Sequence, residues 1–491
     1  MSSATAPAHQ PEHQAWLDFF GGRKDELPSA NLEQIAREAL RHVQVCRGSA
    51  PSSELVAFIN SAGSREQLLS IASLRKLGQF PSVYGSENGS IIRSRLIQNW
   101  NLLLIEEQKR RMIVFQGVSC CDAILIPNEQ LLLIVCHIEK PMVVNCVALL
   151  CRQPDFFQFT SRHITFGGYL VGHSRPYHCL YDSLIGFEAI RAANQLDDLD
   201  LLLSRQGESF FRLDKCLELK QKHLTLERDE INQYCDANAV FILYLGYWVK
   251  AADNDSLNRR LAESLDQQLV QAACNQSTID QHGGLTALKR CRPLIWIGIT
   301  GQKRSWIEQV DGIASILNQL IQVYPSLGVV FDGWTSPINP DHYHKREARN
   351  DDRVISRICR KLQVTKKNRI GVLAGLPLLD KIRIGLEVDA YISNYTTGSM
   401  NIARICKRPG VGHMSQKMMA GPGPHIHFQT LKIDSKWVSD EHDPTKPTGY
   451  INYSIPWQVV YNTFIPILSL LDIPQAQPLK PIELPAQPDN P

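Results

Sequence analysis

The chain has 491 residues, of which 44% are hydrophobic and 21% are charged, with a formal net charge of +3. This length exceeds what one hydrophobic core ordinarily supports, so two domains with extensions are expected. The near-neutral charge gives no indication of a nucleic-acid or membrane-surface partner, although a small positive excess suits a ligand that carries phosphates.

The cysteines indicate a reducing compartment, because all 13 are scattered and no CxxC pair occurs. Residues 1–14 lack the basic and apolar regions of a signal peptide. The longest apolar runs, near Met142–Cys151 and Val240–Trp248, are too short to cross a bilayer. We therefore expect a cytoplasmic protein with no transmembrane segment and with free, mostly buried thiols.

The N-terminal half is expected to change character along its length. Residues 1–14 should be disordered, and residues 15–110 should form a helical extension, because apolar residues recur with a helical period near Leu32–Leu40 and Leu68–Leu74. Short apolar strands and turns follow from residue 111, which predicts an α/β domain over 111–275. The polar, glycine-bearing residues 276–292 predict a linker.

The C-terminal half alternates regularly and is expected to form a second domain over 293–455. Repeated βα units favour an open parallel sheet with helices on both faces. A final helix is expected over 456–472, and a proline-rich tail over 473–491. The expected strands lie at 294–300, 328–332, 369–374 and 390–393 and begin again at 411, with helices at 306–323, 352–362, 377–386 and 400–407.

A basic loop follows the first strand of this predicted domain. Ser305 and Glu308 have the spacing of a capping box, which predicts that the helix begins there. Gln302, Lys303 and Arg304 then lie in the strand-to-helix loop, at the edge where doubly wound sheets bind ligands. The alternative is a solvated basic loop.

Two further polar turns fall at the same predicted edge. The turn of Thr397, Gly398, Ser399 and Met400 precedes a helix, where free N–H groups and the helix dipole favour an anion. Asp332 and Gly333 end the second strand, where the carboxylate can hold a sugar or ribose hydroxyl. Alternatively, Asp332 caps its own turn and Trp334 covers the core.

A third polar segment lies in the N-terminal half. His173, Arg175, His178 and Asp182 follow a glycine-bearing strand candidate. If a helix begins at Pro176, His178 and Asp182 are four residues apart and share a face, which suits a general base with an oriented imidazole. The alternative is a capped structural histidine beside an exposed aspartate.

Other chemistries have weaker signals. The chain contains no GxxxxGK[ST] and no GxGxxG after a strand, which disfavours P-loop ATPases and dinucleotide oxidoreductases. The His342/His344 and His425/His427 pairs lack the spacing of a zinc site, so no metal site is predicted.

The segment Thr397–Ala403, followed by Lys407–Val411, resembles the donor-site helix of GT-B glycosyltransferases, in particular the lipopolysaccharide heptosyltransferases. The resemblance covers roughly residues 292–413. Ser399 stands where those enzymes usually have proline, and Asn401 where they have histidine. The resemblance implies that a basic residue after the first strand, here Arg304, contacts the donor diphosphate.

We therefore expect an α/β protein with two Rossmann-like domains facing a cleft, GT-B-like, behind a helical extension. The C-terminal domain would bind a nucleotide-sugar as co-substrate. The N-terminal domain would carry a saccharide or lipid-linked glycan acceptor, and neither a cofactor nor a metal would be needed. Two alternatives remain open: a nucleotide-sugar epimerase on the same fold, and a non-catalytic scaffold for polysaccharide assembly.

Overall fold

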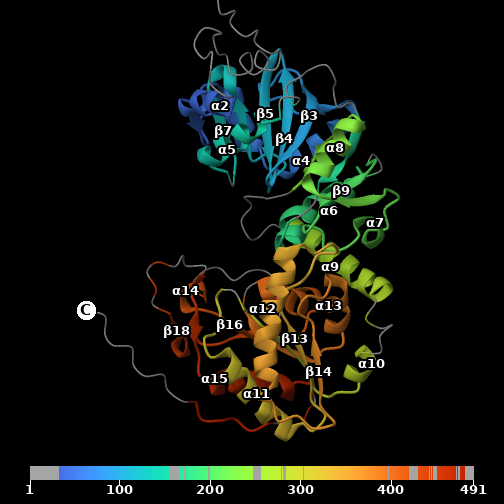
Figure 1. Ribbon diagram of the computed structural model, residues 1–491, viewed down its shortest axis with the longest axis vertical. Helices are drawn as coiled ribbons and strands as arrows, with labels where there is room; N and C mark the ends of the chain where they lie inside the picture. Colours follow the sequence, from blue (N-terminus) through green and yellow to red (C-terminus); the bar gives the residue numbers. More distant parts are fainter. Residues whose placement is uncertain are drawn as a thin grey trace, which may run out of the picture. The chain divides into compact units, whose positions relative to one another are not determined.

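The computed structural model contains two compact units, both of mixed α/β structure (Figure 1). The first holds residues up to Ser209 together with Leu217–Leu265, and the second holds Phe210–Cys216 and the residues from Asp266 onward. The predicted disordered segment 1–14 and most of the predicted tail lie outside the described residues. Those residues are 32–136, 138–153, 156, 165–170, 173–196, 199–246, 256–277, 279, 284–301, 303–395, 397–419, 429–441, 443, 445, 450–471, 473 and 476–481.

The first unit begins with helices that cover a seven-stranded sheet. The sheet is antiparallel except at one edge, where β1 runs parallel to β7. Its strands, in spatial order, are β1 (Gln44–Cys46), β7 (Leu131–Ile134), β6 (Ala123–Ile126), β5 (Arg110–Gln116), β4 (Trp100–Glu107), β3 (Gly89–Ile97) and β2 (Gln79–Phe80). The helices are α2 (Leu32–Arg41), α3 (Ser53–Ser61), α4 (Arg65–Leu74) and α5 (Lys140–Leu150), with short 3₁₀ turns η1 (Arg75–Leu77) and η2 (Pro127–Glu129).

The predicted helical extension over 15–110 is wrong in part, because β1 interrupts its helices and β2, β3 and β4 occupy its last third. The hairpin turns do not contain the asparagine–glycine dipeptides that usually indicate a two-residue turn. Gln98 has a positive φ of 54° in the β3–β4 turn, and Gln108 and Lys109 have φ of 49° and 67° in the β4–β5 turn. Most residues of β3 and β4 are also buried, which removes the alternation of a half-exposed strand.

A second sheet in this unit is wholly parallel. It consists of β10 (His223–Leu226), β9 (Leu202–Arg205), β8 (Thr165–Leu170) and β11 (Val240–Leu243) in that spatial order, so its chain order is 3-2-1-4. Side chains of the first sheet hold β11: Ser94 accepts from Ile242 N at 2.8 Å, and Asn101 donates to Ile242 O at 2.7 Å. The helices beside this sheet are the π-helix η4 (His178–Leu184), α6 (Ile185–Ala192) and α8 (Arg228–Ala237).

The expectation of a Rossmann-like N-terminal domain therefore needs correction. The parallel sheet has a Rossmann-like order, but most strands of the unit belong to the antiparallel sheet. Hairpins joined by two-residue turns pair antiparallel, whereas parallel strands need longer crossover connections.

The second unit is built on a six-stranded parallel sheet. Its spatial order corresponds to 3-2-1-4-5-6 in the chain, which is the order of doubly wound nucleotide-binding domains. The strands are β14 (Arg369–Val372), β13 (Gly328–Asp332), β12 (Leu294–Gly298), β15 (Ala390–Asn394), β16 (Gly410–His413) and β17 (Thr430–Lys432). The strands predicted from the sequence correspond to β12 to β16, whereas β17 was not predicted.

The core of this unit lies on both faces of the sheet. Ile295, Ile297 and Phe331 join one buried cluster with apolar residues of three helices, α11, α12 and α15, while the alternating residues Trp296 and Val330 are buried as well. Burial on both faces is typical of a parallel sheet. Besides α8, the described helices and helical turns from Leu213 onward are α7 (Leu213–Cys216), α9 (Ser256–Gln276), α10 (Gly284–Leu288), α11 (Gln309–Val323), α12 (His342–Cys359), α13 (Leu378–Gly385), η6 (Thr397–Ser399), η7 (Met400–Ile405), α14 (Gln416–Met419), η8 (Ser435–Trp437) and α15 (Trp457–Ser469).

The boundary between the units differs from the expected one. The predicted linker 276–292 contains α10, and Leu288 packs beside Gly371 of β14; the boundary between the units lies instead at Leu265/Asp266, inside α9. A small hairpin of β18 (Ser439–Asp440) and β19 (Tyr453–Ser454) precedes α15. None of the helices that the structure describes is long and apolar enough to cross a membrane.

Candidate functional site

The switch point of the second unit lies between β12 and β15, which are adjacent and parallel. Both strands end at the same sheet edge, so the loops after Gly298 and Asn394 lie at that edge together. In open α/β sheets this is where the crevice for a ligand forms. The structure thus brings the predicted loop of Lys303 and Arg304 to the same edge as the Gly398–Ser399 turn, whereas Gln302 lies outside the described residues.

The loop after β12 is held by the β18–β19 hairpin rather than by a capping box. Ser305 N donates to Asn452 Oδ1 at 3.0 Å, and Tyr453 N donates to Ser305 O at 3.1 Å. The predicted helix start is therefore wrong: α11 begins at Gln309, because the backbone of Ser305 and Trp306 pairs with the hairpin instead. Arg304 has a left-handed backbone, with φ of 56°.

Asp351 of α12 ties together the loops after β12 and β13. Its Oδ1 accepts from Gly301 N at 3.1 Å, and its Oδ2 accepts from Trp334 N at 2.6 Å. A Cβ on Gly301 would lie 2.6 Å from Asp351 Oδ1, so any larger residue would force this carboxylate to shift. Burial raises the pKa of Asp351 to about 6 against the lowering effect of the Trp334 N–H. Sequence reasoning missed this residue, which no motif marks.

Asp332 is engaged in the interior and not directed to a ligand. Lys381, which is fully buried, donates to Asp332 Oδ1 at 2.5 Å and to the carbonyls of Gly333 and Trp334 at 2.8 and 3.0 Å. Burial raises the pKa of Asp332, and the Lys381 charge opposes that rise. The geometry favours the alternative interpretation, in which Asp332 stabilises its turn; Gly333 then lets the backbone pass Asp351.

A buried chain of three side chains lies at the ends of β15 and β16. Asn394 and His413 are register partners, and both contact Tyr453 Oη, at 2.9 Å from Asn394 Nδ2 and at 2.8 Å from His413 Nδ1. Asn394 Nδ2 also donates to Arg304 O at 2.8 Å, which links this chain to the basic loop. The two strand ends and the loop after β12 are thereby fixed to one another.

Two polar atoms of this chain have no partner among the described residues. They are Asn394 Oδ1 and His413 Nε2. Burial lowers the pKa of His413 to about 4, so its ring is neutral. Tyr453 Oη lies 2.8 Å from His413 Nδ1 and 3.3 Å from the carbonyl oxygen of His413. We assign its proton to the nearer Nδ1, which places the ring proton on Nε2. The switch point therefore presents one buried unpaired acceptor and one buried unpaired donor on neighbouring strands.

The predicted anion turn leads into a short π-helix. Gly398 of η6 is exposed, while Ser399 and Met400 are buried. Arg404 of η7 is buried and forms an ion pair with Asp266 at 2.9 Å, which anchors the helix. Segments of π-helix are rare and are found frequently at functional sites.

The polar segment of the first unit lies at the equivalent place in its parallel sheet. The segment follows β8, which is the first strand of this sheet in the chain. β8 lies beside β11, the fourth strand in the chain, so the switch point of the sheet lies between these two strands. His178 Nδ1 lies 2.5 Å from Asp182 Oδ2 on η4, and the side chain of His178 is 42% exposed while that of Asp182 is 13% exposed. The pair has the geometry of an oriented, reachable imidazole.

His173 packs beside His178, and the backbone of Arg175 holds the His173 ring. His173 Nδ1 accepts from Arg175 N at 3.0 Å, and its ring centroid lies 4.4 Å from that of His178. Burial lowers the pKa of His173 to about 3, and the neighbouring His178 adds to the effect. A neutral His173 is therefore expected beside His178 at neutral pH.

Comparisons with known proteins add little to this geometry. No family model and no curated protein matches the chain. Among solved structures, the glycosyl transferase family 9 protein from Veillonella parvula is similar over 54% of this chain and 84% of that chain, with 11% identity and a TM-score of 0.31. A similarity this distant carries no argument about fold or activity.

Proposed function

We propose that the protein is a glycosyltransferase that moves a sugar from a nucleotide-sugar to a hydroxyl of a saccharide or glycan. The second unit would bind the donor at the switch point of its 3-2-1-4-5-6 sheet. The first unit would supply the base that activates the acceptor.

The observation that carries the proposal is the unpaired pair at the switch point, Asn394 Oδ1 and His413 Nε2. A buried polar group without a partner costs roughly 1–3 kcal/mol, so a ligand that pairs with both atoms would recover that cost. One acceptor beside one donor suits a hydroxyl or an amide edge, and nucleotide-sugars carry both kinds of group. The adjoining loop supplies the cations Lys303 and Arg304 for a diphosphate.

The proposed reaction uses the His178–Asp182 pair of the first unit and the basic loop of the second. Asp182 accepts a hydrogen bond from the Nδ1–H of His178, which leaves Nε2 unprotonated and able to take the proton of an acceptor hydroxyl. The acceptor oxygen then forms the new bond to the sugar, and the sugar–phosphate bond breaks. Arg304 and Lys303 stabilise the negative charge on the departing nucleoside diphosphate.

A thermal-shift and calorimetry screen with UDP-, GDP-, ADP- and CMP-linked sugars tests the donor site. One nucleotide class should stabilise the protein, by about 2.7 kcal/mol at a hundredfold excess over Kd. If none of the four classes binds, the proposal fails. Turnover of the donor without an acceptor would identify an epimerase, and binding without any turnover would identify a scaffold.

The variant His413→Asn sharpens this test. Asparagine retains an acceptor near the position of Nδ1 for Tyr453 and removes the Nε2 donor. Donor affinity should fall by roughly 1–3 kcal/mol, while the unliganded protein stays folded. The exposed His342 on α12 provides a control, because His342→Asn should change neither quantity. Equal donor affinity in His413→Asn and wild type would place recognition elsewhere.

A further inference from the structure

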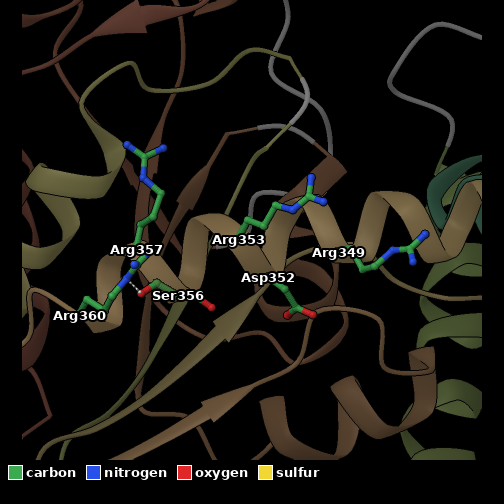
Figure 2. Close-up of a pocket in the computed structure, with 6 residues that line it drawn as sticks. All are labelled: Arg349, Asp352, Arg353, Ser356, Arg357 and Arg360. Atoms are coloured by element: carbon green, nitrogen blue, oxygen red, sulfur yellow. Dashed lines mark hydrogen bonds between the residues drawn. The ribbon is translucent and has the colours of Figure 1, made fainter.

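A row of arginines follows one exposed face of α12 and its end. Arg349, Arg353 and Arg357 are four residues apart, and Arg360 follows three residues later; all four are exposed (Figure 2). Residues at this spacing are neighbours on a helix surface, so the four guanidinium groups form a single row of roughly 16 Å. We refer to these four residues as the arginine row.

The arginine row is not neutralised by carboxylates. Within the described residues, the ion pairs of this helix and its C-terminal extension are Arg346 with Glu347 and Lys361 with Asp311, and neither includes the row. Arg353 donates to Asn350 at 3.3 Å, and Arg360 donates to a backbone carbonyl at 3.3 Å. Like charges four residues apart destabilise a helix by about 0.2–0.5 kcal/mol per pair. A bound anion would reverse this repulsion.

The surface beside the row is hollowed and has a second polar row. An open hollow of about 480 Å³ is lined by the four arginines together with Asp352 and Ser356. Asp352 and Ser356 are also four residues apart, so a carboxylate and a hydroxyl run alongside the cations. Figure 2 shows Arg353 and Arg357 extended away from the helix on one side, with the Asp352 carboxylate on another.

The lining residues decide which anion fits. Among the residues that the structure describes, no aromatic side chain lines the hollow, so it lacks the stacking surface of single-stranded nucleic-acid sites. The same described lining contains no apolar side chain, which insertion into a membrane surface would require. Asp352 would repel a polymer that presents phosphate groups on all sides. A polymer with carboxylates on one edge and hydroxyls on the other satisfies both rows.

The row also begins next to the proposed donor site. Asp351, two residues beyond Arg349, accepts from Gly301 N in the loop after β12. The helix runs from this edge of the sheet toward the opposite one, because α12 follows the carboxyl end of β13. A chain lying along α12 therefore leads to the sheet edge that carries Lys303 and Arg304.

We propose that the arginine row binds an anionic saccharide chain that carries carboxylates, such as a uronic-acid polymer. The anionic character of the ligand follows from the arginines, and its saccharide character rests on the proposed glycosyl transfer. Guanidinium groups would pair with carboxylates in bidentate fashion. The Asp352 carboxylate would accept from the sugar hydroxyls, and the Ser356 hydroxyl would accept from them or donate to them.

Fluorescence anisotropy with a labelled oligogalacturonate tests the site on the full-length protein. Wild type should bind it, with an affinity that falls as salt rises, and should not bind a neutral malto-oligosaccharide of equal length. Arg353→Gln/Arg357→Gln should bind it roughly 30-fold more weakly. Arg259→Gln/Arg260→Gln, which removes two exposed charges from α9, is the matched control and should differ less than about twofold from wild type.

Competing outcomes would overturn the inference. Equal losses in the two double variants would show a non-specific charge effect. Tighter binding of polyphosphate or single-stranded DNA with the same number of charges would assign the row to phosphate polymers, and binding to anionic lipid vesicles alone would assign it to a membrane. Nucleotide-sugar binding is measured on the same samples. If the nucleotide-sugar binds and oligogalacturonate does not, only this inference fails. If oligogalacturonate binds and no nucleotide-sugar does, only the proposed donor site fails.

Discussion

Replacing Lys381 by methionine should destabilise the second unit by roughly 3–5 kcal/mol at neutral pH. The substitution nearly conserves volume but leaves the Asp332 carboxylate, which is 4% exposed, without its cation. It also removes the donor to the carbonyls of Gly333 and Trp334. A unit of this size should lose about 2–4 °C of melting temperature for each kcal/mol.

The loss should depend on pH in a defined direction. Burial raises the pKa of Asp332, and removing Lys381 removes the charge that opposes the rise. An acid whose folded pKa lies above its unfolded value of about 3.9 stabilises the fold most below that value and less as pH rises through the folded pKa. The difference between variant and wild type should therefore shrink as pH falls from 7 toward 4.

Urea unfolding followed by tryptophan fluorescence at pH 7 and pH 5 measures these quantities. Lys361→Met is the matched control, because Lys361 and Asp311 form an exposed pair, and it should cost less than about 1 kcal/mol. The double variant Lys381→Met/Asp332→Leu should regain most of the stability, since no buried charge is left unpaired. A single variant as stable as the control, or a double variant as unstable as the single, would refute the reasoning.

The other predictions concern binding, catalysis, pH and thiol exposure. Arg304→Ala should weaken nucleotide-sugar binding by roughly 1–3 kcal/mol in calorimetry, and an unchanged Kd would contradict its role. His178→Ala or Asp182→Asn should slow transfer roughly 10²–10⁴-fold with donor affinity unchanged; a lower melting temperature with full activity per folded molecule would instead indicate a structural pair. Burial lowers the pKa of His413 from 6.5 to about 4, so the unfolded chain takes a proton first as pH falls, and stability should drop by up to roughly 3 kcal/mol between pH 6.5 and 4; urea unfolding of His413→Asn should lack this part of the slope. Cys274 is the exposed thiol among thirteen free cysteines, so a thiol reagent should label it first, and Cys274→Ser should remove the fast phase.

The C-terminal alternation of strands and helices was readable from the sequence, because its periodicity is local. Each βα unit repeats a short buried apolar run, a turn and an amphipathic helix, and parallel strands then place the following loops at one edge. The expected strands accordingly became β12 to β16, and the final helix became α15. The i,i+4 spacing of His178 and Asp182 was equally local, and it placed both side chains on one turn of η4.

Contacts between distant segments decided the rest. The capping motif at Ser305 and Glu308 was overridden by Tyr453, whose strand pairs with the loop. Lys381 forms an ion pair with Asp332 inside the unit. Asn394 lies beside His413 only because β15 and β16 pair in that register. The hairpins near Gln98 and Gln108 form without the usual turn residues, because burial of their strands compensates for the unfavourable backbone. Local propensity amounts to tenths of a kcal/mol per residue, whereas a buried hydrogen bond or ion pair is worth roughly one or more, so tertiary partners prevail wherever the two conflict.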